Sequence, residues 1–148
     1  MDYIKIRFGS GLEGFTSDLE RTIGQIFASV SPMFALSAQT WKPQIDIYET
    51  PGEIIILSDI AGVLKEDLVV ELDSTAVRIS GKRQEEQRDS QTKFHLAEIP
   101  YGPFERTLYL PAPIDPEKVT ASYTNGFLQI RMAKKAADGP LRVAIKGL

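Results

Sequence analysis

The sequence predicts an all-β sandwich carried by one domain with an extension at each end. Short stretches of alternating apolar and polar residues recur along the chain, with turn residues at short spacing between them. Asn125-Gly126 is the strongest two-residue hairpin signal, because a type I′ turn needs positive φ at both central residues. No parallel strand–helix–strand pattern is present. At 148 residues the chain is long enough to bury a substantial core.

The expected strands share this period-two pattern or a short apolar run, and each is bounded by turn residues. Those on the C-terminal side of Gly102 are the clearest, because Pro111 and Pro113 end one strand and Asn125-Gly126 joins the next two. We expect strands at Gln44–Glu49, Ile54–Asp59, Leu68–Leu72, Ala76–Ser80, Phe94–Ile99, Phe104–Leu110, Val119–Thr124 and Phe127–Met132.

Residues 1–40 have a different character, since they are rich in phenylalanine and mostly without a clear period. One helix is expected, because Ser17 and Glu20 form a capping box and apolar residues follow at helical spacing as far as Val30. Pro32 lies just beyond its expected end. We expect this segment to lie outside the compact core.

Composition excludes several classes of function. The net charge is -3, which gives no electrostatic reason to expect nucleic-acid binding. The chain has no cysteine, which excludes disulfides and thiol catalysis and fits a reducing compartment. No apolar run approaches the ~20 residues of a membrane span, and the N-terminus lacks the apolar core of a secretory signal. A soluble cytoplasmic protein is expected.

Catalysis is not expected either. His95 is the single histidine, no Gly-x-Ser-x-Gly elbow is present, and no His, Cys or carboxylate grouping has metal-ligand spacing. Gly9–Gly14 matches G-x-G-x-x-G, but no acidic residue follows ~20 positions on and no parallel strand follows the expected helix. The sequence therefore predicts no enzyme, no cofactor and no metal site.

Two features point to contacts between chains. Residues 82–93 are charged or polar and carry the expected Phe94–Ile99 strand away from the sheet, where it must find a partner to pair with. Arg106 lies on the apolar face of its strand. Its stem either covers apolar surface with its head in water, or its charge pairs across a subunit interface with a carboxylate such as Glu98.

Several blocks together resemble the small heat-shock proteins of the α-crystallin type. The resemblance runs from about Pro43 to Lys135, with a second piece near the C-terminus. Its blocks are Pro43–Glu49, Ile60–Val63 with Lys65–Leu68, Val77–Arg83, Tyr101–Arg106 with Leu110-Pro111, Ala121 with Asn125–Leu128, and Val143-Ala144-Ile145.

The resemblance implies an immunoglobulin-like sandwich at residues 41–135, a partly helical N-terminal segment at 1–40 and an extended C-terminal tail at 136–148. It implies a homo-oligomer of swapped dimers, joined by the arm strand Phe94, His95, Leu96, Ala97, Glu98 and Ile99, with Arg106 as an interface charge. The tail residues Val143 and Ile145 would dock in a groove formed by Val69, Glu71, Thr120 and Ser122 of another dimer.

The function that this resemblance implies is an ATP-independent chaperone, a holdase that binds unfolding proteins and suppresses their aggregation. The apolar surface offered to these clients is expected from Phe8, Phe15, Phe27, Met33 and Phe34. An alternative is a co-chaperone-like sandwich that binds one defined protein partner. A monomer of that kind would have no reason to carry the arm strand and the tail motif.

Overall fold

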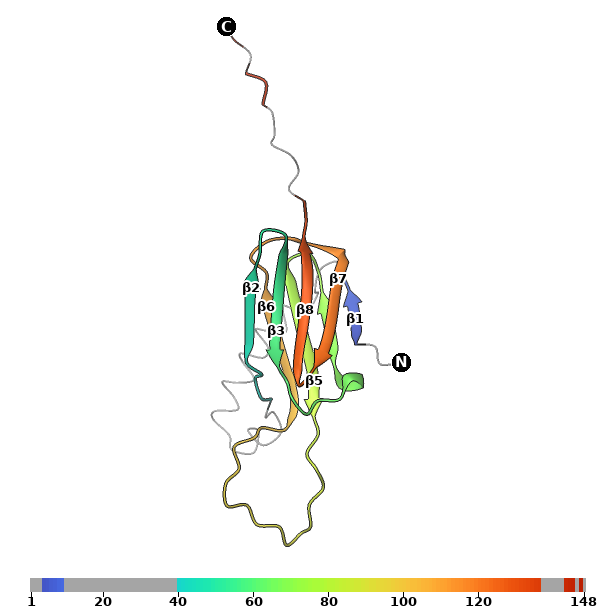
Figure 1. Cartoon of the computed structure of the whole chain (residues 1–148), viewed down its shortest axis with the longest axis vertical. Coiled ribbons are helices and arrows are strands. Elements are labelled where there is room, and N and C mark those ends of the chain that lie inside the picture. The colour runs from blue at the N-terminus through green and yellow to red at the C-terminus, as the bar shows by residue number, and fades with distance from the viewer. Residues whose placement is uncertain (1–3, 10–39, 137–142, 146, 148) are drawn as a thin grey trace, which may run out of the picture.

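Two four-stranded sheets pack face to face in the computed structural model, which describes residues 4–9, 40–136, 143–145 and 147 (Figure 1). One sheet has the strand order β1-β4-β5-β6 and the other β2-β3-β8-β7. A short 3₁₀ helix, η1, lies at Lys65–Asp67. The strands are β1 Lys5–Phe8, β2 Ile45–Glu49, β3 Glu53–Asp59, β4 Val69–Leu72, β5 Ala76–Arg83, β6 Gly102–Tyr109, β7 Ile114–Thr124 and β8 Phe127–Lys134.

The core is the layer of aliphatic side chains between the two sheets. Every second residue of the inner strands points into it, as the period-two pattern predicts. On β4 and β5 the residues expected to point inward, including Val70, Leu72 and Ile79, are fully buried. The opposite sheet supplies Ile54, Ile56, Leu128, Ile130 and Met132. The all-β sandwich prediction is confirmed.

The β7–β8 hairpin turns at Asn125-Gly126, as predicted. Both residues have positive φ, 52° and 84°, and Thr124 pairs with Phe127 across the turn. Gly126 also lets the turn approach the neighbouring loop, because a Cβ there would lie 2.7 Å from the Cβ of Ala61. The Gly126 carbonyl accepts a hydrogen bond of 2.9 Å from the amide of Ile60. The turn therefore holds the loop that leads from β3 to β4.

Two strands differ from the predicted bounds by three residues or more. β5 continues past Ser80 to Arg83, and β7 begins at Ile114 instead of Val119. The pairing of β7 with β8 shifts between Ile114 and Val119. Pro116 lies within that interval and has no N–H to donate, so an irregular ladder is expected there.

The largest differences from the prediction concern residues 94–99 and residues 5–8. Phe94–Ile99 was expected to be a strand, but it is an exposed irregular segment in the single chain. A strand needs backbone partners, and no strand of the described chain pairs with these residues. The eighth strand is β1 instead, which pairs in parallel with β4. The expectation that residues 1–40 lie outside the core is therefore wrong for Ile4 and Ile6, which pack against it.

The helix expected after Ser17 lies outside the described residues. Within the ranges that the structure describes, no helix is long and apolar enough to cross a membrane.

Gly81 provides a test of the packing between β5 and β6. A Cβ at this position would lie 2.8 Å from two ring atoms of Phe104, which is itself buried, and 3.0 Å from the carbonyl oxygen of Asp67. We expect Gly81→Ala to lower the free energy of unfolding by about 1–3 kcal/mol, because it overpacks the core. Urea denaturation measures this loss. Gly52→Ala is the matched control, since nothing lies within 4 Å of its Cβ, and equal stability of the two variants would contradict the prediction.

Candidate protein-interaction site

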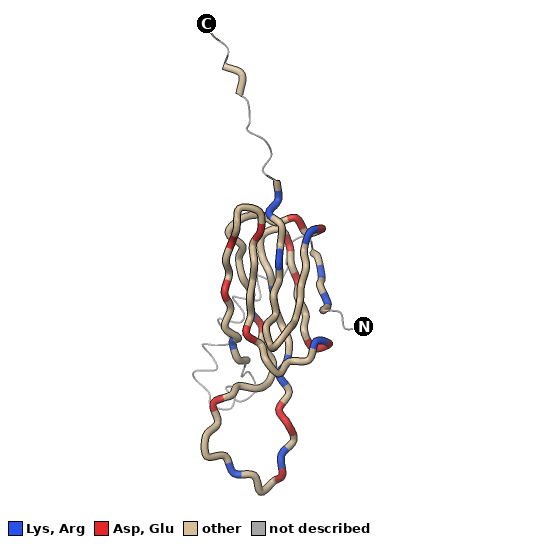
Figure 2. Tube along the Cα trace, viewed as in Figure 1, with Lys and Arg blue, Asp and Glu red and all other residues tan. Residues whose placement is uncertain are grey.

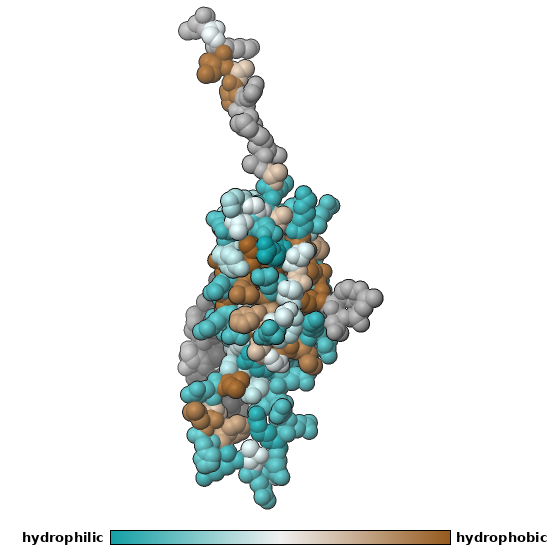
Figure 3. All heavy atoms as spheres, viewed as in Figure 1, coloured by the Kyte–Doolittle hydropathy of each residue, from teal (hydrophilic) through white to brown (hydrophobic). Residues whose placement is uncertain are grey.

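The arm is the loop of residues 84–101 between β5 and β6, which projects from one end of the sandwich (Figure 1). Its large apolar side chains stay uncovered. Phe94, Leu96 and Ile99 are 54%, 74% and 65% exposed, and hydrophobic side chains are visible at this end of the molecule in Figure 3. Ala97, Glu98 and His95 are exposed as well. The arm thus presents the predicted residues to solvent in one chain and leaves them available to a partner.

Arg83 holds the base of the arm. Its Nε donates to the carbonyl of Ala61 at 2.8 Å, and its Nη1 donates to the carbonyl of Pro100 at 3.0 Å. The guanidinium also lies over the ring of Trp41, 3.9 Å from its centroid. One side chain therefore ties together both ends of the arm and the segment before β2. Sequence reasoning missed this role, because the three partners are 17 to 42 residues away and no local pattern links them.

The arm has contacts of its own. Asp89 organises its tip, because its carbonyl accepts from the amide of Thr92 and its carboxylate accepts from the amide of Gln91. Arg88 pairs with Glu85 at 2.6 Å, and its guanidinium lies 4.8 Å from the ring centroid of Phe94. A hydrogen bond with the side chain of Tyr101 raises the pKa of Arg88. Charges of both signs alternate along the arm in Figure 2.

Arg106 lies on β6, and its Nη1 donates to the main-chain carbonyl of Pro43 at 2.7 Å. The nearby Trp41 Nε1 donates to the carbonyl of Gly102 at 3.0 Å, and its ring is 5.0 Å from that of Phe104. These contacts lay the segment 41–43 along the outer edge of β6. Arg106 therefore has a structural role within one chain that the sequence did not indicate. Its pairing with Glu98 of a second copy stays a prediction.

The expected tail-accepting groove is occupied on its β4 side. Val69 pairs with Lys5 and Glu71 pairs with Arg7, so β1 takes the outer edge of β4. On the β7 side, Thr120 and Ser122 are exposed. The residues of β7 that pack toward the core here include Ala121 and Tyr123, one position from those predicted.

Tyr123 closes the inner side of this groove. Its hydroxyl donates to the carbonyl of Ile60 at 3.0 Å, and burial raises the pKa of the phenol. Ile4, Ile6, Ala121 and Tyr123 line a shallow depression of about 400 Å³ between the two sheets. Lys65, Ser122 and Thr124 line the same depression, so the aliphatic side chains of β1 lie in surroundings that are partly apolar and partly polar.

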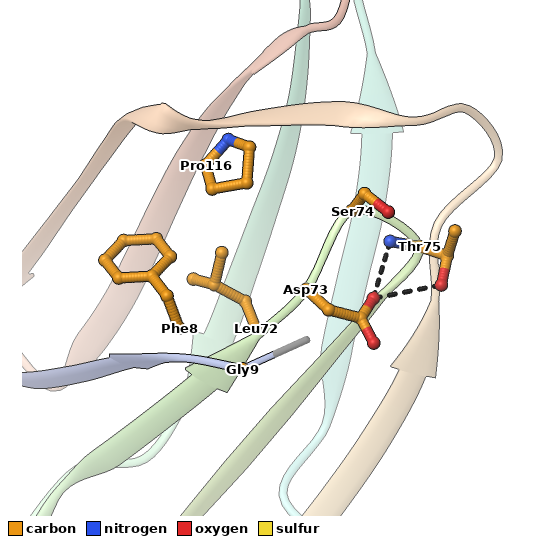
Figure 4. A pocket seen from close by; sticks show the side chains of 7 residues that line it. All are labelled: Phe8, Gly9, Leu72, Asp73, Ser74, Thr75 and Pro116. Atoms are coloured by element: carbon orange, nitrogen blue, oxygen red, sulfur yellow. Dashed lines mark hydrogen bonds between the residues drawn. The ribbon is translucent and has the colours of Figure 1, made fainter. Parts of the chain in front are cut away.

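At the other end of β1, Phe8 lies beside Leu72 and Pro116 (Figure 4). The adjoining turn is held by Asp73, whose Oδ1 accepts from the amide and hydroxyl of Thr75 at 2.6 and 2.9 Å. Phe8 remains 55% exposed. It is the one predicted client-binding residue in the described part of the chain, since Phe15, Phe27, Met33 and Phe34 lie outside it.

The described tail residues are exposed, with Val143 at 73% and Ile145 at 93%. Figure 3 shows hydrophobic atoms on the tail, beyond the end of the sandwich. Within the described residues, no group of three or more His, Cys, Asp or Glu side chains is placed to hold a metal ion. The arrangement is suited to binding other polypeptides through sheet edges and apolar extensions.

The fold and these surfaces define a β-sandwich interaction domain with an arm and a tail. The model of the Hsp20/alpha crystallin family matches residues 46–146, and the chain belongs to this family of small heat-shock proteins. The 18.1 kDa class I heat shock protein of Oryza sativa subsp. japonica is 33% identical over 141 residues, which cover 90% of this chain and 79% of the rice protein. Small heat shock protein C2 of Rickettsia felis is 29% identical over 77% of this chain and 76% of its own length.

Solved structures agree with this assignment. Heat shock protein 16.0 from Schizosaccharomyces pombe is 30% identical, with a TM-score of 0.60 over 72% of this chain and 99% of that one. A small heat-shock protein from Xylella fastidiosa, described as having a distinct high order structure, is 32% identical with a TM-score of 0.61 over 73% of this chain and 99% of that one.

The contacts of Arg83 predict the behaviour of the arm. We expect Arg83→Met to speed amide hydrogen exchange at residues 99–102 about tenfold, because two hydrogen bonds and a cation–π contact that hold the base of the arm are lost. Arg83→Lys should not restore the slow exchange, because a lysine lacks the planar fork that reaches both carbonyls. Hydrogen–deuterium exchange with mass spectrometry measures the effect. Lys82→Met is the control, and equal exchange in Arg83→Met and Lys82→Met would refute the role of Arg83.

Proposed function

We propose that this protein is an ATP-independent cytoplasmic holdase, which binds unfolding proteins and keeps them from aggregating. Besides family membership, the exposed apolar side chains of the arm and the tail support this function. The sandwich already has a complete core, yet large apolar side chains remain exposed on the arm and the tail. Monomeric soluble proteins seldom leave such residues uncovered without a partner. The proposal needs no bound nucleotide and no catalytic residue.

The building block is a swapped dimer in which each arm pairs with the sandwich of the second copy. The outer edge of β2 supports this, because within the described residues β2 pairs only with β3. Ile47 and Tyr48 of β2 are partly exposed, so an incoming strand would cover them. All three large apolar side chains of the arm are exposed, and in such a strand Phe94 and Leu96 would share one face while Ile99 would lie on the other. The cation proposed to pair with Glu98 of the second copy is Arg106 on β6, which also donates to the carbonyl of Pro43 within its own chain.

Larger assemblies form when the tail of one dimer docks in the groove of another dimer, a contact that we call the tail clip. Val143 and Ile145 are separated by one residue, so both point the same way in an extended segment. An added strand gains backbone hydrogen bonds along a sheet edge and seats its alternate side chains in the groove. Each clip is weak, but several acting together give a stable assembly whose single contacts still exchange.

Clients would be bound by the N-terminal segment. Phe15, Phe27, Met33 and Phe34 are large apolar residues in a stretch with little regular pattern, and Phe8 adds an exposed ring at the end of β1. Methionine side chains adapt to many apolar surfaces, and a segment without regular structure can wrap around varied partners. Both properties suit a protein that binds many different unfolding chains. Burying these residues in the assembly keeps the protein soluble until a client appears.

The arm provides a test of the dimer. We expect Phe94→Ser, Leu96→Ser and Ile99→Ser together to convert the smallest stable species from a dimer to a monomer. Full burial of three such side chains is worth about 5 kcal/mol, which is a large share of a dimer interface. Native mass spectrometry gives the subunit count. Gln87→Ser, Gln91→Ser and Lys93→Ser on the same arm form the control, which should remain dimeric. A dimer that survives the apolar triple substitution excludes the arm as the joining element.

The client surface is tested with the full-length chain. We expect Phe15→Ser, Phe27→Ser, Met33→Ser and Phe34→Ser together to remove most of the protection of heat-labile enzymes, because the apolar contact area is lost while the sandwich is intact. Light scattering with three unrelated enzymes, in the absence of nucleotide, measures the protection. Thr16→Ser, Gln25→Ser and Gln39→Ser control for changes in the segment itself. Full protection by the apolar variant would disprove this client surface, and protection of a single enzyme by the wild type would favour a dedicated partner.

A further inference from the structure

The outer edge of β4 is already occupied in this chain by its own N-terminus. β1 runs parallel to β4, with Lys5 opposite Val69 and Phe8 opposite Leu72. The amide of Gly9 continues the pairing by donating to the carbonyl of Leu72 at 3.4 Å. Figure 1 shows β1 as the last strand on this side of the sandwich. An edge strand can accept one neighbour on its open side, so β1 excludes any other strand from this position.

The side chains of β1 alternate as the groove requires. Ile4 and Ile6 are half-buried and pack against the core, next to Ala121 and Tyr123 of β7. Lys5 and Arg7 point outward and are exposed. β1 therefore bridges the gap between the two sheets with two aliphatic residues separated by one spacer.

Arg7 also completes a row of alternating charges across the outer face of the sheet. Its guanidinium lies 3.8 Å from the carboxylate of Glu71, which is 3.6 Å from Arg78. Arg78 is in turn 3.7 Å from Glu105 on β6. β1 thus meets the edge of β4 with two properties, which are aliphatic residues facing inward and a basic residue opposite Glu71.

The tail carries the same pattern. Ile4-Lys5-Ile6-Arg7 and Val143-Ala144-Ile145-Lys146 both read aliphatic, spacer, isoleucine, base. In the tail the two aliphatic residues have no cover, whereas in β1 they are packed. The tail therefore has the same sequence properties with which β1 fits this groove.

We propose that β1 and the tail of a second copy are alternative occupants of the β4 edge, so that β1 acts as a built-in competitor of assembly. The inference extends the tail clip of the proposed function and gives it a regulator. β1 is only four residues long and lies at the edge of its sheet, so an incoming tail can displace it. Because the two strands exclude each other from the same edge, tail docking releases β1.

The test measures binding of a fluorescent peptide with the sequence of residues 141–148 to the full-length chain. Val143→Ser and Ile145→Ser are present in every protein, so that the protein's own tail does not compete. Adding Ile4→Ser and Ile6→Ser should tighten peptide binding about tenfold, because the groove no longer has to be vacated first. Fluorescence anisotropy gives the dissociation constants, and hydrogen exchange at Val69–Leu72 reports that the β4 edge is the place of binding.

Lys5→Ser is the matched control on the outward side of β1 and should leave the affinity close to that of the background. A second measurement uses the unlabelled peptide of residues 2–9 as a competitor, which should displace the tail peptide from the Ile4/Ile6 variant. Equal or weaker tail binding by that variant overturns the competition, and so does a failure of residues 2–9 to displace the tail. Absence of tail binding to both proteins overturns the tail clip and the competition with it. None of these readouts depends on client protection, which is tested separately.

Discussion

The contacts at the edges of this sandwich depend on one constraint, because the backbone N–H and C=O groups of a sheet edge need hydrogen-bond partners. A two-sheet sandwich has four such edges, and natural proteins cover them or use them. The β4 edge is covered by β1. The β6 edge is lined by the segment 41–43, whose Trp41 amide donates to the carbonyl of Pro103 at 3.3 Å and whose Pro43 carbonyl accepts from Arg106. The outer edges of β2 and β7 have no neighbouring strand in the described chain. The two covered edges thus belong to one sheet, and the two open edges belong to the other.

Much of the fold is predictable because it depends on local alternation. The inward positions of β4, β5 and β8 follow from period two, and the β7–β8 turn follows from Asn125-Gly126. These signals need only neighbouring residues. The family assignment was equally accessible, because several short blocks that resemble those of the family occur in order along the chain.

What could not be predicted depends on partners that are distant or absent. Phe94–Ile99 has the pattern of a strand, but pattern does not create a backbone partner, and in one chain the segment is irregular. β1 has the same kind of pattern and is a strand, because β4 lies beside it although 64 positions separate Lys5 from Val69. Arg83 and Arg106 gained their roles in the same way, through carbonyl groups that sequence spacing does not reveal.

The alternation of isoleucine and basic residues in β1 has a further consequence for the register of this strand on β4. Sliding β1 by two residues would place Lys5 opposite Glu71 and Ile4 opposite Val70, so these two positions would still receive a basic and an aliphatic residue. A slip of two keeps every side chain on its own face, whereas a slip of one reverses them all. The contact of Phe8 with Leu72 distinguishes the two registers. The alternation of Ile4-Lys5-Ile6-Arg7 therefore fixes which face of β1 is buried, whereas the register of β1 on β4 depends on Phe8.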